Sequence, residues 1–209
     1  MGIISLSLQE QIILIPTILF ALTFHEYAHA RVAYLLGDST AYYQNRMNLN
    51  PLNHIDPFGF LALYFLGFGW AKPVPVYARN LKNIRNDMLL IAMAGPASNF
   101  LLAIIGAIIF RLNTYIYISD LLFDPLIRFI QINILLAIFN LIPLHPLDGS
   151  RILPQFIKNP RTLYKIELYG PRILMGLIIL NLIGIPILSL IIFYPLSVIF
   201  FFLTGIPLF

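Results

Sequence analysis

Long apolar runs, separated by polar and basic segments, dominate the chain. Three of them are residues 11–36, 88–110 and 126–144. Each is close to the roughly 20 residues that a helix needs to cross the hydrocarbon core of a bilayer. No charged residue follows Arg172, so the tail at 172–209 can hold one tilted helix or two short ones broken near Pro186 or Pro195, and we expect two. The pattern predicts an all-α polytopic membrane protein, a bundle of about five to six transmembrane helices.

The segment between the first two runs, residues 38–87, is the longest stretch outside the predicted spans. Its apolar patch at 58–70 is too short and too glycine-rich to cross a bilayer, so we expect a re-entrant or interfacial hairpin there. The segment is also too short to house an added folded domain. We therefore expect a single membrane-embedded domain over residues 1–209, with its core at 11–157 and the transmembrane tail at 172–209.

Composition supports this interpretation. The chain is 59% hydrophobic and 11% charged, whereas a soluble domain carries about 25% charged residues. The absence of cysteine excludes a secreted disulfide scaffold. Thirteen Lys and Arg in so apolar a chain indicate membrane flanks. We therefore expect membrane lipid, and no nucleic acid, among the partners.

The basic residues also predict an orientation. They gather in segments 38–87 and 145–172, while the connection near 111–125 sets Arg111 against Asp120 and Asp124. Two crossings separate the two basic segments, so both lie on one side, and the positive-inside rule makes that side cytoplasmic. We expect a multi-pass protein of the cell (inner) membrane.

The first apolar run contains His25-Glu26-Tyr27-Ala28-His29, the H-E-x-x-H pattern. Spacing i, i+4 puts both imidazoles on one helical face, about 6 Å apart, where they could bind one metal ion. Glu26 falls beside them, where it could take a proton from water. The alternative is a hydrogen-bonded histidine pair without a metal. An ionisable residue at membrane depth costs about 2.5–3.5 kcal/mol on insertion scales, and a bound cation would compensate that cost.

A catalytic zinc site takes three protein ligands and a water molecule. The strongest third ligand is Asp148, which follows the run 126–144. That run and the run 11–36 both point toward the cytoplasm, so Asp148 and the histidines fall in the same leaflet. His145 could be a supporting neighbour of Asp148, and either His145 or His54 could be an alternative ligand. Interface hydrogen bonding is the simpler interpretation for both.

These residues resemble the motifs of the site-2 protease family of intramembrane zinc metalloproteases, in its short prokaryotic form without a PDZ domain. The resemblance covers residues 20–150. It is carried, in the family's order, by His25-Glu26-x-x-His29, Asn50-Pro-Leu-Asn-His54-Ile-Asp-Pro-Phe-Gly59, Gly69-Trp-Ala-Lys-Pro-Val-Pro75, Gly95-Pro-Ala-Ser-Asn99 and Asn140-x-x-Pro143-x-x-Pro146-Leu-Asp148-Gly149.

The resemblance implies a zinc metalloendopeptidase that binds one zinc ion per chain through His25, His29 and Asp148, with Glu26 as the catalytic base. Its substrates would be membrane proteins, cut within or near their transmembrane segments in regulated intramembrane proteolysis. The resemblance also places Asn99 and Asn140 at the active site, holding the substrate backbone or the oxyanion. The alternative for each asparagine is a hydrogen bond between helices.

Two other functions fit the same residues. A membrane metal-binding protein or transporter would need Glu26 only as a charge, whereas a protease needs it as a base. An inactive relative acting as a scaffold is disfavoured because neither a ligand nor the base is missing.

Overall fold

The structure, a computed structural model, describes residues 2–112 and 120–208. Over these ranges the chain is helical, and the only β-pairing is an isolated antiparallel bridge between Ile55 and Ala71. The helices are α1 (Leu8–Leu35), α2 (Thr40–Tyr43), α3 (Pro57–Leu66), α4 (Ile84–Leu112), α5 (Asp120–Leu141), α6 (Pro160–Leu182) and α7 (Ile187–Thr204). Short 3-10 turns are η1 (Ile3–Ser5), η2 (Pro51–Asn53), η3 (Ala78–Asn80), η4 (Asp148–Arg151) and η5 (Leu153–Gln155). The predicted all-α fold is confirmed.

In the described part of the chain, four helices are long and apolar enough to cross a membrane: α1, α4, α5 and α7. The first three match the predicted runs to within a few residues, except that α5 begins earlier and ends earlier than expected. Part of the predicted connection at 111–125, residues 113–119, lies outside the described residues. The chain is a membrane protein with an all-α bundle, and the number of crossings stays a prediction.

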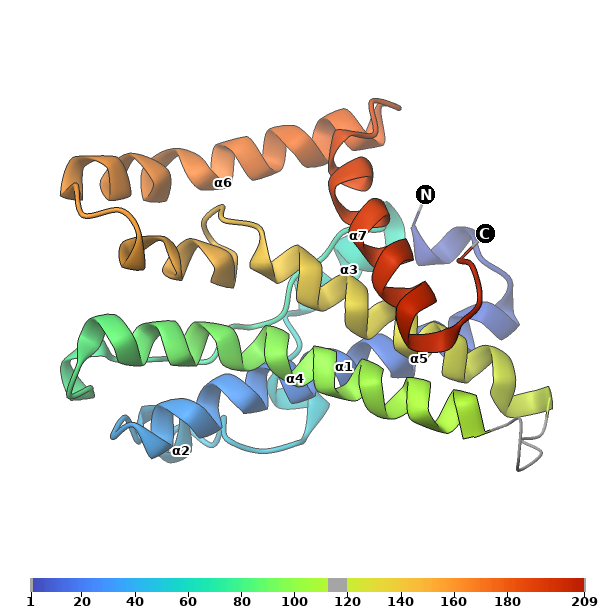
Figure 1. Cartoon of the computed structure of the whole chain (residues 1–209), viewed down its shortest axis with the longest axis horizontal. Coiled ribbons are helices and arrows are strands. Elements are labelled where there is room, and N and C mark those ends of the chain that lie inside the picture. Colours follow the sequence, from blue (N-terminus) through green and yellow to red (C-terminus); the bar gives the residue numbers. More distant parts are fainter. Residues whose placement is uncertain (1, 113–119, 209) are drawn as a thin grey trace.

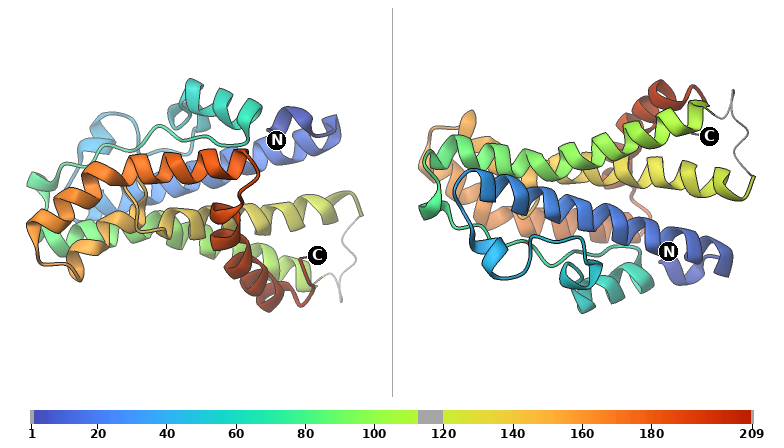
Figure 2. Two further views of the ribbon diagram at one scale, coloured as in Figure 1. Left: turned by 90° about the horizontal axis from the view of Figure 1, so that it is seen from above. Right: turned by 90° about the horizontal axis from the view of Figure 1, so that it is seen from below.

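The helix α4 lies at the centre of the bundle. It packs against α1 and α5, and the three helices run side by side in all views, whereas α7 crosses steeply (Figure 1, Figure 2). Small residues let α4 and α5 approach closely, since a Cβ on Gly106 would lie 2.9 Å from Ile130 Cγ1. Together with Phe200 of α7, Ile130 belongs to a fully buried apolar cluster at this junction.

The tail differs from the prediction. We expected a basic loop through Arg172 and a helix after it, but α6 already begins at Pro160, with Asn159 as its N-cap. The cationic residues lie exposed on the first half of this helix, while Gly170 and Leu174 face inward and are buried. An amphipathic helix therefore replaces the expected loop. The predicted break near Pro186 is confirmed, and Pro195 lies inside α7.

The segment between α1 and α4 forms a hairpin around α3. Asp56 caps α3, accepting a hydrogen bond from the Gly59 N–H at 2.9 Å, and Gly67 ends it in the left-handed conformation at φ 78°. The two arms are joined where the Lys72 N–H donates to the His54 carbonyl at 2.8 Å. Whether this hairpin enters the membrane or lies at its surface stays a prediction.

Asp38 follows α1 and forms hydrogen bonds with residues at both ends of this segment, and its carboxylate should make the stability of the fold depend on pH. The carboxylate is buried and accepts hydrogen bonds from Thr40, Asn80 and the Tyr77 N–H. Burial acts to raise the pKa of Asp38, but these hydrogen bonds outweigh it and lower the pKa below its usual value. Such a group stabilises the fold above its unfolded pKa of about 3.9, and that contribution is lost as pH falls through the lower folded pKa.

We expect Asp38→Asn to cost about 1–3 kcal/mol at pH 7, because one donor to the carboxylate loses its acceptor. The difference in thermal unfolding midpoint between Asp38→Asn and wild type, measured in detergent, should narrow as pH is lowered toward 3. A difference that stays constant over this range would contradict the assignment.

Candidate metal centre

Three side chains converge inside the bundle. His25 and His29 lie one turn apart on α1, and Asp148 opens η4, just beyond α5. The two Nε2 atoms are 3.0 Å apart, and each lies 3.1 Å from Asp148 Oδ2. Among the described residues, these three form the only group of His, Cys, Asp and Glu that could hold a metal ion. Both histidines are buried, so the group is shielded from solvent.

The other ring nitrogen of each histidine is occupied. His25 Nδ1 lies 2.6 Å from Asn99 Oδ1, and His29 Nδ1 lies 2.7 Å from the Ile91 carbonyl oxygen. Both partners are on α4 and can only accept, so each Nδ1 donates its proton. In the neutral histidines, both Nε2 lone pairs therefore face the Asp148 carboxylate.

Asp148 is positioned by the close approach of Gly149 to the end of α5. A Cβ on Gly149 would lie 2.3 Å from the Leu141 carbonyl oxygen, so a larger residue would push η4 away. Burial acts to raise the pKa of Asp148, but its contacts with the His25 and His29 side chains hold it well below the usual range. The carboxyl is therefore ionised at neutral pH.

Gly95 of α4 opens the space in front of the histidines. A Cβ at this position would lie 2.3 Å from His29 Nε2 and 2.5 Å from His25 Nε2, closer than real Cβ contacts allow. The absent side chain of Gly95 thus leaves a cradle at the point where the ligand atoms meet.

The residues fit a zinc ion in donor type and spacing. Two ligands that are each about 2.0–2.1 Å from a tetrahedral zinc ion are about 3.3 Å apart, close to the separations of 3.0 and 3.1 Å seen here. Two imidazole nitrogens and one carboxylate oxygen form a ligand set that zinc accepts with its fourth position open. Three facing lone pairs also require a shared positive charge.

Glu26 is buried beside the cluster but is held by a different part of the chain. Neighbouring residues point about 100° apart around a helix, so Glu26 faces the hairpin while His25 faces α4. Its Oε2 accepts a hydrogen bond from the Val74 N–H at 3.0 Å. Arg46 is buried nearby, donates to the Lys72 carbonyl at 2.7 Å and interacts electrostatically with Glu26. The segment around Val74 is thus fixed from both sides.

The remaining predicted site residues do not join the ligand group. The Asn140 amide donates to the Leu136 carbonyl within α5 at 3.0 Å. His54 is buried, and its Nε2 lies 2.8 Å from the Asn48 carbonyl oxygen. The backbone of His145 packs against α6, where a Cβ on Gly170 would lie 2.7 Å from the His145 nitrogen. The predicted roles of His54 and His145, as alternative ligands or as a supporting neighbour of Asp148, stay predictions.

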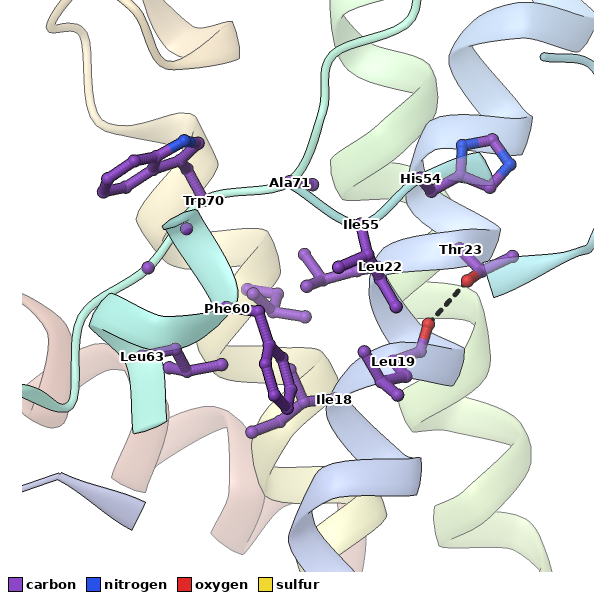
Figure 3. Close-up of a pocket in the computed structure, with 13 residues that line it drawn as sticks. Ile18, Leu19, Leu22, Thr23, His54, Ile55, Phe60, Leu63, Trp70 and Ala71 are labelled. Carbon is purple, nitrogen blue, oxygen red and sulfur yellow. Dashed lines mark hydrogen bonds between the residues drawn. The ribbon is translucent and has the colours of Figure 1, made fainter. Parts of the chain in front are cut away.

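An apolar pocket of about 80 Å³ lies between α1 and α3, and none of the three residues of the metal-ligand group lines it. Figure 3 shows Ile18, Leu19 and Leu22 of α1 near Phe60 and Leu63 of α3. The pocket ends near Thr23, whose hydroxyl donates to the Leu19 carbonyl at 2.6 Å. Residues 19, 22, 23 and 26 share one helical face, so the pocket lies against the face of α1 that also carries Glu26.

Sequence comparison with known proteins identifies two relatives whose names fit the predicted metal site. The chain is 43% identical over 151 residues to the "Putative zinc metalloprotease YwhC" of Bacillus subtilis, in an alignment that covers 69% of this chain and 68% of the relative. The chain belongs to this family. It is also 29% identical over 160 residues to the "Putative zinc metalloprotease Rip2" of Mycolicibacterium smegmatis, of whose length it covers 59%. No family model matches the chain, and no solved structure is significantly similar to it.

In this family member, three of the residues around the site have contacts that were not predicted from the sequence. They are Asn133, which contacts Asn99, and Arg46 and Val74, which surround Glu26. Asn133 has a sequence signal of its own, because it is a polar residue in the middle of an apolar helix, whereas Val74 is marked only as part of the Gly69–Pro75 motif. The roles of Arg46 and Val74 arise from a tertiary contact between the hairpin and α1.

Proposed function

We propose that the chain is an intramembrane zinc metalloprotease of the site-2 type, which hydrolyses peptide bonds within or near transmembrane segments of membrane proteins. The observation that carries this proposal is the convergence of His25, His29 and Asp148, with Glu26 alongside, between helices long and apolar enough to cross a membrane. The alignments with the two relatives whose names begin "Putative zinc metalloprotease" support it. The proposed cofactor is one Zn²⁺ per chain.

The membrane setting favours a bound cation over an uncharged histidine pair. His25, Glu26 and His29 are buried in the second half of α1, and each ionisable group at membrane depth costs about 2.5–3.5 kcal/mol on insertion scales. The two Nδ1 protons are committed to Asn99 and Ile91, so they cannot neutralise the Asp148 carboxylate. A divalent cation is the group that satisfies all three ligand atoms together.

Zinc, when bound, supplies a Lewis acid that polarises a carbonyl and lowers the pKa of water. Glu26 takes the proton from the attacking water as general base and returns it to the leaving amine as general acid. The Val74 N–H holds one oxygen of this carboxylate, which leaves the other oxygen for the proton. The side-chain amide of Asn99 bonds to His25, Ala21 and Asn133. We therefore propose that Asn99 orients the metal ligand His25 and does not stabilise the oxyanion.

A substrate helix must unwind locally before attack, because its peptide groups are shielded by their own hydrogen bonds. The pocket between α1 and α3 (Figure 3) lies against the α1 face that carries Glu26, and its apolar lining suits the side chains of a membrane segment. We therefore propose that the substrate reaches the site from the hairpin side of α1. The proposed partners are a transmembrane protein substrate and membrane lipid.

The orientation follows from the basic residues. The first half of α6 carries exposed cationic residues, and α6 begins at the same end of the bundle as α4 (Figure 1). By the positive-inside rule, we propose a protein of the cell membrane with its active site opening toward the cytoplasm.

The metal content of the purified full-length chain tests this proposal. We expect about one zinc per chain in the wild type, by elemental analysis after dialysis, and near-complete loss in Asp148→Ala, because two ligands do not make a stable site. Asp56→Asn is the matched control, since its carboxylate caps α3 and lies outside the ligand group. A wild type that holds no zinc even after dialysis against zinc would contradict the proposed function.

A further inference from the structure

Asn133 is a fully buried polar residue on α5 that the proposed chemistry does not use. Its Oδ1 accepts a hydrogen bond from Asn99 Nδ2 at 3.0 Å, and its Nδ2 donates to the Phe129 carbonyl at 2.9 Å. The second bond fixes the orientation of the Asn133 amide, because a carbonyl oxygen accepts only from the nitrogen side. Its Oδ1 is therefore held toward Asn99.

The amide of Asn99 is oriented in turn. Its Nδ2 donates to Asn133 Oδ1 and to the Ala21 carbonyl at 3.2 Å, and its Oδ1 faces His25 Nδ1 at 2.6 Å. If this amide rotated by half a turn, its oxygen would meet two other oxygens and its nitrogen would meet the Nδ1 proton. Asn133 supplies one of the two acceptors that prevent this rotation.

The two histidine ligands depend on different kinds of support. His29 donates to the backbone carbonyl of Ile91, which is part of α4 and cannot rotate. His25 donates to a side-chain amide, which can rotate unless its other end is held. A rotated Asn99 amide would favour the proton on His25 Nε2, which removes the lone pair that a metal needs. The support of His25 therefore depends on the two acceptors behind Asn99, the Ala21 carbonyl and the Asn133 side chain, whereas His29 needs no such second residue.

We propose that Asn133 is a positioning residue for the metal site: through Asn99 it keeps the His25 proton on Nδ1 and leaves Nε2 free to bind a divalent cation. This inference rests on the metal site of the proposed function and not on proteolysis. Groups that support a ligand histidine in this way contribute about 10–100-fold to metal affinity.

The test compares zinc affinity and the histidine tautomer in the full-length chain in detergent. We expect Asn133→Leu, which keeps the side-chain volume and removes the acceptor, to weaken zinc binding by about 10–100-fold in competition with a chromophoric chelator. In the zinc-free protein, the ¹⁵N spectrum of labelled histidine should show His25 losing its Nδ1–H form, while His29 keeps it.

Two further variants separate positioning from stability. Asn133→Asp should restore most of the affinity, because a neutral carboxyl, which burial favours, supplies the same acceptor and the same donor. Asn181→Leu removes a hydrogen bond with Ser189 at 2.7 Å between α6 and α7, and should leave zinc affinity unchanged.

Wild-type affinity in Asn133→Leu would overturn the proposal. The proposal would also be overturned if Asn133→Asp failed to restore zinc affinity and if zinc affinity fell in proportion to the unfolding temperature in all three variants. If the wild type bound no zinc, the proposed function would fail instead. The ¹⁵N spectrum would then decide on Asn133, since an unchanged His25 tautomer in Asn133→Leu would refute its role.

Discussion

Replacing Gly95 with alanine is expected to weaken zinc binding by at least about 100-fold, the upper end of what a residue supporting a ligand contributes. The added methyl group would lie 2.3 Å from His29 Nε2 and 2.5 Å from His25 Nε2, within the space that the metal and both ligand atoms require. The histidines cannot move aside together, because their Nδ1 protons are bound to Asn99 and Ile91. Chelator competition on the purified Gly95→Ala protein measures the effect.

Two other helical glycines serve as controls. A Cβ on Gly176 of α6 meets nothing within 4 Å, so Gly176→Ala should keep zinc affinity and stabilise the helix by about 0.5–1 kcal/mol. Gly106 is on the same helix as Gly95, and a methyl group added there crowds Ile130 of α5. Gly106→Ala should therefore lower the unfolding temperature without changing zinc affinity. If Gly95→Ala and Gly106→Ala bound zinc with the same affinity, the metal would have to lie elsewhere.

Helical periodicity and topology predicted that His25, His29 and Asp148 lie close together, and the structure brings these three side chains together. The spacing of His25 and His29 fixes a common helical face from local geometry alone. Asp148 is 119 residues beyond His29, yet the direction of the two helices already placed it in the same leaflet, and the structure brings its carboxylate within 3.1 Å of both rings. The prediction is possible because the direction in which each long apolar helix crosses the bilayer determines which helix ends lie on the same side.

The hydrogen-bond partners that hold His25 and Glu26 in place could not be predicted in the same way. Which atom faces His25 depends on how α4 rotates against α1, and the Val74 N–H reaches Glu26 only because the hairpin folds back. Val74 belongs to the Gly69–Pro75 motif, but a backbone donor carries no sequence signal, so the motif does not show that the Val74 N–H reaches Glu26. Asn133 had a signal, but the motif drew attention to Asn140, one heptad later, which bonds within its own helix.

The start of α6 was misplaced for a related reason. Counting cationic residues assigned 145–172 to a loop, although the charges of α6 lie on its exposed face and its other face is apolar. Charge counts predict the side of a membrane better than they predict secondary structure, because an interfacial helix and a loop carry the same residues. The caps were visible in the sequence, since Asn159 followed by Pro160 is a typical helix start.

Exchange of Glu26 for glutamine is expected to lower proteolysis by about 10²–10⁴-fold while zinc affinity stays close to wild type. Glutamine keeps the size of the side chain and still offers an oxygen to the Val74 N–H, so the position of residue 26 should not change. It cannot accept a proton from water near neutral pH. Zinc should remain bound, because Glu26 is outside the group of three ligand atoms.

Cleavage is measured on a pool of single-span transmembrane peptides reconstituted with the protein in vesicles, with products identified by mass spectrometry, beside the zinc content of the same samples. Glu10→Gln is the matched control, because Glu10 caps the exposed start of α1 and lies far along that helix from the cluster. Loss of zinc in Glu26→Gln to the extent seen in Asp148→Ala would make Glu26 a ligand. The metal-binding or transport function would then be favoured over a protease, since only hydrolysis requires residue 26 to be a base rather than a charge.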